Sequence, residues 1–278
     1  MKAMICLLFT VVVSLPLLAE ISKPIDLPAV QAKVDKGDPE AELELGRAYH
    51  LGRGVPKDFA KALDLYQKSA AQGNAKAMFN IGYLYSHAQG VKVDNQAALD
   101  WFRKAADKKL PAAELKLGML YQFGENGVEK DYPTAIKYLT LAAAHEDAPE
   151  QVGPACNALG NIYEQGLGVP VDGKVAFDWY KKGAEAGYGK AQGTTGRFYY
   201  EGLYVKKDCA QSYMWLKLAS LQGDIMSLHL LGDYISGKQL NQKQMEEGDR
   251  LVLERQKQKI SSSAKPSSSD SPATTSEK

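Results

Sequence analysis

Few side chains in this sequence have the types and spacing that enzymatic chemistry requires. The chain contains no G-x-S-x-G, H-E-x-x-H or C-x-x-C sequence and no dinucleotide-binding fingerprint. Its four histidines lie in separate segments without metal-ligand spacing, at His50, His87, His145 and His229. We therefore assign the histidines structural or solvent-exposed roles. We predict a protein that is not an enzyme, with no metal site and no cofactor.

One segment resembles a phosphate-binding loop. Residues 168–174 read GVPVDGK, which places Gly168, Gly173 and Lys174 at the spacing of such a loop. The next residue is Val175, where a Ser or Thr would be needed to hold magnesium, and the segment follows a helical pattern instead of a strand. An ordinary turn between two helices explains it better than a nucleotide site.

The composition is that of a folded chain without a dominant charge. The 278 residues are 45% apolar, and 34 Lys plus Arg against 33 Asp plus Glu leave a formal net charge of +1. A surface built to grip nucleic acid or anionic membrane would need an excess of Lys and Arg. We therefore predict no nucleic-acid partner.

The two ends of the chain differ from its middle. Residues 1–19 contain an apolar run from Ile5 to Leu18 followed by Ala19, a pattern typical of a cleaved secretory signal peptide. The run is shorter than the roughly 20 residues that span a bilayer, so we expect no transmembrane segment after cleavage. The predicted localisation is exported, either periplasmic or secreted. Residues 261–278 contain no large apolar residue and predict a disordered Ser-rich tail.

The middle of the chain is a repeat. Segments related to LELGRAY place glycines in register at spacings of 36, 36, 42, 36 and 36, at Gly46, Gly82, Gly118, Gly160, Gly196 and Gly232. An aspartate follows each of the first five glycines by 12 or 13 residues, at Asp58, Asp94, Asp131, Asp172 and Asp208. The longer interval contains extra residues around 145–153, which we expect to form a loop.

Each unit carries two helical patterns. Apolar and small residues recur at spacings of three and four on both sides of a Gly- and Pro-containing turn, which predicts a helix, a turn and a second helix. The aspartate is positioned to cap the second helix. The glycines mark close helix approach, and all three tryptophans occupy one repeat position, which predicts packing roles for Trp101, Trp179 and Trp215.

These observations divide the chain into a signal peptide at 1–19, a repeat domain at 20–260 and the tail. The units are placed near 38–73, 74–109, 110–151, 152–187 and 188–223, with a partial unit at 224–237. A charged helix at 241–258 is suited to cap the end of the stack, and residues 26–36 to open it.

The repeat resembles the Sel1-like repeats, a branch of the tetratricopeptide-like α-solenoids, over about residues 38–236. The resemblance implies an all-α fold, a right-handed superhelical solenoid of stacked antiparallel helix pairs. Two positions depart from the pattern, because Ala88 and Tyr204 replace loop glycines and would affect local turns. Members of such families serve in envelope assembly, signalling and interaction with host cells, and the repeat alone does not choose among these.

The implied fold also predicts whether the two cysteines of the repeat domain can form a disulfide. Cys156 lies early in a first helix and Cys209 opens a second helix, so the antiparallel arrangement separates them by a helix length of roughly 18 Å. A disulfide needs Cα atoms within about 7 Å. We expect two unpaired thiols.

Some cysteine-rich relatives are associated with penicillin binding and weak β-lactam hydrolysis, which makes an S-x-x-K sequence worth seeking. The one present runs from Ser262 to Lys265 in the predicted tail, where a nucleophile would have no oxyanion hole. A penicillin-interacting enzyme is therefore an alternative function that we do not prefer. A peptidoglycan-binding module is another.

The concave face of such a solenoid binds peptides or proteins. The variable positions one and four residues after each glycine are expected to line it, at Arg47, His50, Tyr83, Ser86, Met119, Gln122, Asn161, Glu164, Arg197 and Tyr200. For each residue, an ordinary solvated position is the alternative. We predict an exported adaptor that binds a protein or peptide partner in this groove, and a monomer.

Overall fold

The computed structural model describes residues 25–263, and within that range it contains 13 α-helices and no strand. The predicted signal peptide and most of the predicted tail lie outside the described residues. The chain divides into two compact units, one ending at Lys108 and one beginning at Lys109.

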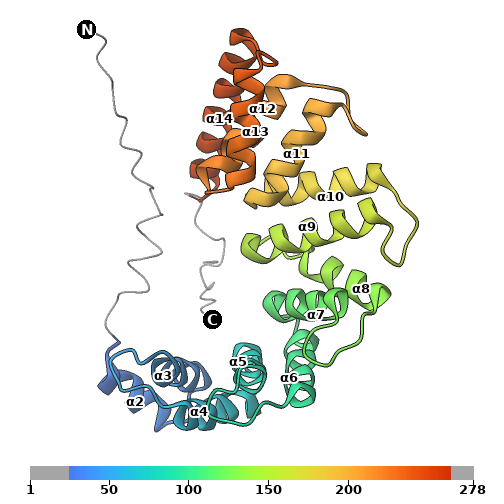
Figure 1. Cartoon of the computed structure of the whole chain (residues 1–278). Helices are drawn as coiled ribbons and strands as arrows, with labels where there is room; N and C mark the ends of the chain where they lie inside the picture. The colour runs from blue at the N-terminus through green and yellow to red at the C-terminus, as the bar shows by residue number, and fades with distance from the viewer. Residues whose placement is uncertain (1–24, 264–278) are drawn as a thin grey trace, which may run out of the picture. The chain divides into compact units, whose positions relative to one another are not determined.

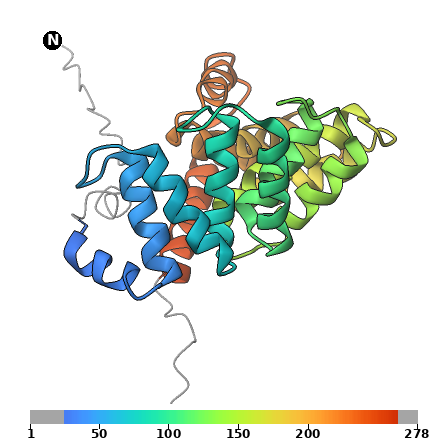
Figure 2. The same cartoon turned by 90° about the horizontal axis from the view of Figure 1, so that it is seen from below.

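The first unit contains a short opening helix and two helix pairs (Figures 1 and 2). Its helices are α2 (Leu27–Val34), α3 (Pro39–Leu51), α4 (Phe59–Ala71), α5 (Ala75–Ser86) and α6 (Asn95–Asp107). Helix α3 packs on α4 and α5 on α6, and α4 also packs on α5. The two pairs are therefore stacked, as the repeat predicts.

The second unit continues the pairing and ends in two helices of different character (Figure 1). Its helices are α7 (Pro111–Phe123), α8 (Tyr132–Ala142), α9 (Pro149–Gln165), α10 (Gly173–Glu185), α11 (Gly189–Glu201), α12 (Cys209–Leu221), α13 (Ile225–Ser236) and α14 (Gln242–Ser263). The pairs are α7 with α8, α9 with α10 and α11 with α12, while α13 and α14 both pack on α12.

The five repeated aspartates cap the second helix of each pair, which confirms their predicted role. Each carboxylate accepts a hydrogen bond from a backbone N–H in the first helical turn, at Lys61, Ala97, Thr134, Val175 and, for Asp208, both Ala210 and Gln211. The N-terminal N–H groups of a helix have no partner within the helix, so these side chains fix where each second helix begins.

The repeated glycines mark the points of closest approach between paired helices. A methyl group placed on Gly46 would lie 2.7 Å from a ring carbon of Tyr66, and one on Gly196 would lie 2.8 Å from Cγ of Leu216. Gly82, Gly118 and Gly160 are equally crowded by Phe102, Leu139 and Tyr180. The partner residue always lies eight positions after the capping aspartate, so one large side chain covers each glycine.

Two expectations about the turns are wrong. The insertion in the third repeat interval does not form only a loop, because α9 has 17 residues against 13 in α3, α7 and α11 and so gains a turn at its start. The replaced loop glycines leave the turns intact, since Ala88 and Tyr204 adopt φ of 53° and 59°. Holding non-glycine residues in this left-handed region costs about 1 kcal/mol each.

Candidate functional site

The predicted groove residues of the first unit are engaged with their own surroundings. Arg47 is exposed, whereas His50 is half-buried between the two helix pairs. His50 Nδ1 lies 3.3 Å from the hydroxyl of Tyr66, and Nε2 lies 2.7 Å from Oε1 of Gln89. His50 therefore joins the second helix of one pair to the loop that follows the next first helix.

The surroundings of His50 favour the neutral imidazole. Burial lowers the pKa of His50, the hydrogen bond to the Gln89 side-chain oxygen opposes this, and the charges of Lys57 and Arg47 lower it further. A neutral ring with a proton on Nε2 can donate to Gln89 and accept from the Tyr66 hydroxyl, so one tautomer satisfies both contacts.

Tyr83 and Ser86 follow on α5. The Tyr83 ring stacks on His87 with ring centroids 3.9 Å apart, and Ser86 Oγ donates to the backbone carbonyl of Tyr83 at 3.0 Å. These contacts are local to the end of one helix. Among the four predicted residues of this unit, Arg47 and Tyr83 offer the most open surface.

The expectation that all ten predicted residues line an open face is wrong, as the residues of the second compact unit show. Gln122 is only 4% exposed, and its Oε1 has no hydrogen-bond partner among the described residues. Met119 and Asn161 are half-buried. The position four after the glycine is at least partly covered in each of the five paired repeats.

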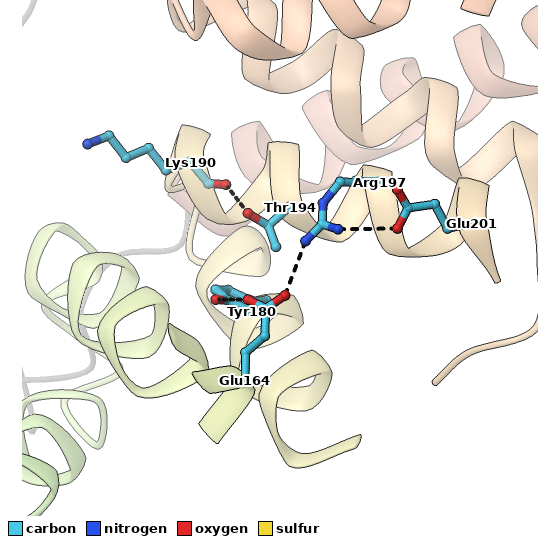
Figure 3. Close-up of polar contacts among 6 residues, drawn as sticks. All are labelled: Glu164, Tyr180, Lys190, Thr194, Arg197 and Glu201. Atoms are coloured by element: carbon cyan, nitrogen blue, oxygen red, sulfur yellow. Dashed lines mark hydrogen bonds and ion pairs between the residues drawn. The ribbon is translucent and has the colours of Figure 1, made fainter. Parts of the chain in front are cut away.

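Glu164 and Arg197 form a network between α9, α10 and α11 (Figure 3). The guanidinium of Arg197 donates to Glu164 Oε1 and to Glu201 Oε2, both at 3.2 Å. The Tyr180 hydroxyl donates to Glu164 Oε2 at 2.7 Å, and burial followed by the Glu164 carboxylate raises the pKa of Tyr180. Both predicted residues therefore stabilise helix packing.

Tyr200, the last predicted residue, also packs within the unit. Its ring stacks on that of Tyr234 with centroids 3.7 Å apart and planes 17° from parallel. This contact joins α11 to α13. Several of the ten predicted groove residues thus pack between helices.

A surface groove lies next to this network, between α11 and α13. It has a volume of about 520 Å³, and its walls are Lys190, Gly193, Thr194, Arg197, Asp224, Met226, Ser227, His229, Leu230 and Asp233. Of the ten predicted residues only Arg197 lines it. The candidate binding site is therefore the groove between α11 and α13, and not a row of residues along all the first helices.

Several groove side chains are free to bind. The ammonium of Lys190, the imidazole of His229 and the carboxylate of Asp233 form no hydrogen bond or ion pair with another described residue. Figure 3 shows the Lys190 ammonium apart from the Arg197 network, although the Lys190 carbonyl accepts from Thr194 Oγ1 at 3.1 Å. Met226 is 76% exposed.

Sequence reasoning missed these residues although the repeat contained their signal. Asp233 lies one position after Gly232, as Arg197 does after Gly196, so extending the same rule to the sixth unit finds it. Leu230 and Thr194 lie two positions before the glycine, and Met226 and Lys190 six before it. These spacings of three and four place one face of each helix in the groove.

The described residues contain no cluster of His, Cys, Asp and Glu that could hold a metal ion. Cys156 and Cys209 are free, and burial raises the pKa of Cys156 to about 11, so this thiol stays protonated. Ser262 lies in the last turn of α14, and Lys265 lies outside the described residues. No described helix is long and apolar enough to cross a membrane.

Stacked antiparallel helix pairs with glycine crossings and a groove between first helices define an α-helical repeat protein. The chain belongs to the Sel1 repeat family, whose model matches residues 39–74, 75–110, 111–147, 153–188 and 191–224. Sel1 repeat proteins generally mediate protein–protein interactions, and their fold is typically a non-catalytic scaffold.

Several solved structures are similar to this chain. A Sel1 repeat protein from Oxalobacter formigenes is 31% identical, with a TM-score of 0.68 over 85% of this chain and 92% of that one. A protective antigen of uropathogenic Escherichia coli with an SLR fold is 26% identical (TM-score 0.47, 88% and 60% covered). A Sel1 repeat protein from Klebsiella pneumoniae is 24% identical (TM-score 0.46, 75% and 98% covered). No curated protein matches the chain.

Proposed function

We propose that this chain is an exported adaptor without enzymatic activity, which binds a peptide segment of a partner protein in the groove between α11 and α13. Export is inferred from the sequence of residues 1–19. Binding is inferred from the family, whose members mediate protein–protein interactions, and from the groove itself.

The observation that carries the proposal is the set of unengaged side chains in the groove. Lys190 and Asp233 carry opposite charges and pair with no described residue, while Met226 and Leu230 supply apolar surface. A ligand with an apolar side chain between an acidic and a basic group satisfies all of these at once. Peptides have this chemistry, whereas a neutral glycan strand would leave both charges unpaired.

The test begins with a phage-displayed random peptide library, selected on the purified protein. Peptides that bind wild type should carry acidic and basic residues on either side of an apolar one. Lys190→Glu or Asp233→Lys should weaken such a peptide about 10-fold or more, and the double reversal should select peptides of opposite charge order. Unchanged selection by the double reversal would contradict the groove assignment.

Matched controls are available outside the groove. Lys243→Glu on α14 and Asp147→Lys in the loop before α9 reverse the same charges at exposed positions. Both should bind the selected peptides as wild type does. Arg197 and Tyr200 make poor test sites, because Arg197 links Glu164 to Glu201 and Tyr200 stacks on Tyr234, so replacing them would disturb packing.

The biological partner is then sought by crosslinking in the native cell envelope. A protein that is captured by wild type and by the two controls, and lost with the double reversal, would be the expected result. Fractionation of the same cells tests export, since a protein retained entirely in the cytoplasm would contradict that part of the proposal.

A further inference from the structure

Helix α13 exposes the face that every other first helix packs against its second helix. The face consists of the positions seven and four before the glycine, the glycine itself and the position three after it. In α13 these are Ile225, Leu228, Gly232 and Ile235, a stripe at spacings of three, four and three. Leu228 is 55% exposed, whereas the residue at its position is at most 9% exposed in the five paired units. Ile225 and Ile235 are 65% and 41% exposed.

The glycine of this helix is uncovered. A methyl group placed on Gly232 would meet no described atom within 4 Å, while the five equivalent glycines each have a large side chain within 2.8 Å. A glycine in an exposed helix lowers its stability by up to about 1 kcal/mol relative to alanine. Gly232 therefore occupies the repeat position at which two helices approach closely, but no described helix packs on it.

Helix α14 does not fill this place, and the sequence explains why. Only nine residues separate Gly232 from Asn241, which caps α14, compared with 12 or 13 in the paired units. Eight positions after this cap, where a large side chain would cover the glycine, stands Asp249. Asp249 instead pairs with Lys217 of α12.

The rest of α14 packs on α12 and on earlier helices, since Val252 lies in one core cluster with Ala184 of α10, Ala191 of α11 and Trp215 of α12. Gly248 lies against the Tyr213 ring, and the Arg255 guanidinium lies 4.1 Å from the Trp215 ring centroid. The C-terminal helix therefore lies against α10, α11 and α12, and it leaves Gly232 of α13 uncovered.

A second copy of α13 is complementary to the stripe. When two such helices run antiparallel and centre on residue 230, Leu228 of each copy lies opposite Gly232 of the other, and Ile225 lies opposite Ile235. A leucine over a glycine is the contact that Leu139 makes with Gly118 and Leu216 with Gly196 inside this chain. The flanks are complementary too, because Asp224 of one copy comes near Lys238 of the other.

We propose that the protein forms a two-fold symmetric dimer through antiparallel packing of α13, with Leu228 of each copy seated on Gly232 of the other. This replaces the monomer expected from the sequence. The interface shares Asp224 with the groove, whereas Met226, Leu230 and Asp233 lie on another side of α13. One helix pair buries less area than stable obligate dimers do, so we expect micromolar affinity.

Sedimentation equilibrium of the purified full chain across the micromolar range tests the dimer. Leu228→Glu places two charges in the symmetric interface and should weaken dimerisation at least about 100-fold. Met226→Glu is the matched control, since it makes the same chemical change on the other side of α13 and should leave the dimer intact. Circular dichroism verifies that both variants stay helical. A monomeric wild type, or a dimer indifferent to Leu228→Glu, would overturn the proposal.

Oxidative crosslinking tests the register. In a Cys209→Ser background, which removes the partly exposed thiol, Ile225→Cys combined with Ile235→Cys should give a disulfide-linked dimer. Ile225→Cys alone should not, because two copies of residue 225 would lie about 15 Å apart along the helix axes. Crosslinking of the single variant, or none with the double variant, would exclude this antiparallel arrangement. The groove proposal does not depend on either result.

Discussion

Helices α11 and α13 share the same repeat pattern, but only α11 is covered by a second helix of the chain. Both contain the glycine of close approach, but Gly196 is covered by Leu216 and Gly232 is bare. The difference arises in the segment that follows each helix, where a cap at the right distance and a large residue eight positions later are present after α11 and missing after α13. The glycine-containing face of a first helix is therefore only one side of an interface. Whether the chain covers that face depends on the helix that follows.

Substituting the two glycines is expected to give the largest difference between α11 and α13. Gly196→Leu forces a large side chain into the space of Leu216 and should lower the free energy of unfolding by about 3 kcal/mol. Gly232→Leu meets no neighbour and replaces a poor helix former, so monomer stability should rise by up to about 1 kcal/mol.

Urea unfolding followed by circular dichroism measures both variants, at protein concentrations low enough to keep the chain monomeric. The same Gly232→Leu substitution should abolish the dimer, because the notch for Leu228 is filled. Equal destabilisation at the two sites would mean that α13 is covered within the monomer.

The position four before the glycine gives the next comparison. In α7 this position is Glu114, which is buried and accepts a hydrogen bond from His145 Nε2 at 2.8 Å. In α11 it is Gln192, whose Oε1 accepts from Gln222 at 2.7 Å. Burial raises the pKa of Glu114, although the His145 contact opposes the rise. One contact thus uses a carboxylate where the other uses a neutral amide.

Glu114→Gln should raise the free energy of unfolding at pH 8 by up to about 1 kcal/mol, because it removes a buried charge and keeps an acceptor for His145. A pKa raised by folding adds stability that is complete below the unfolded value of 4.5 and disappears as the pH rises through the folded value. The gain should therefore shrink toward pH 4. Thermal unfolding at both pH values measures it, and a loss at pH 8 would show that the contact of the Glu114 carboxylate with His145 is stabilising.

Short-range features were predictable from the sequence. The caps at Asp58 and Asp172, and the closeness of Gly46 to the next helix, depend on residues within about twenty positions. The burial of Gln122 and the extra turn of α9 depend on packing between neighbouring units, which a repeat pattern does not contain. The groove was only partly predictable, because the predicted positions came from the first five repeats and the sixth repeat supplies six of the ten residues that line the groove.

The position four after the glycine gives a smaller effect. In α3 this is the half-buried His50, and in α13 it is the exposed Ser236. Folding lowers the pKa of His50, so its contribution to stability is complete above the unfolded value of 6.5 and is lost as the pH falls through the folded value. Wild-type stability should therefore decline below pH 6.5.

His50→Gln should remove part of that decline, with a difference well below 1 kcal/mol at neutral pH if the amide keeps a contact to Gln89. His229→Gln is the control, because His229 is exposed on α13 and forms no hydrogen bond, ion pair or ring contact with another described residue. Thermal unfolding between pH 5 and pH 7.5 compares the three proteins. A decline that survives in His50→Gln and vanishes in His229→Gln would place the pH sensitivity on the open helix instead of the closed pair.

The smallest effect concerns the rim of the open helix. Lys238→Glu should bring like charge near Asp224 of the second copy and weaken the dimer a few-fold at low ionic strength, because exposed ion pairs contribute less than about 1 kcal/mol each. The effect should shrink in high salt, where exposed charges are screened, while the loss caused by Leu228→Glu should persist. Lys243→Glu on α14 makes the same exposed charge change outside the stripe and should leave dimerisation unchanged. A salt-independent effect of Lys238→Glu would indicate that the substitution alters α13 itself and not its pairing.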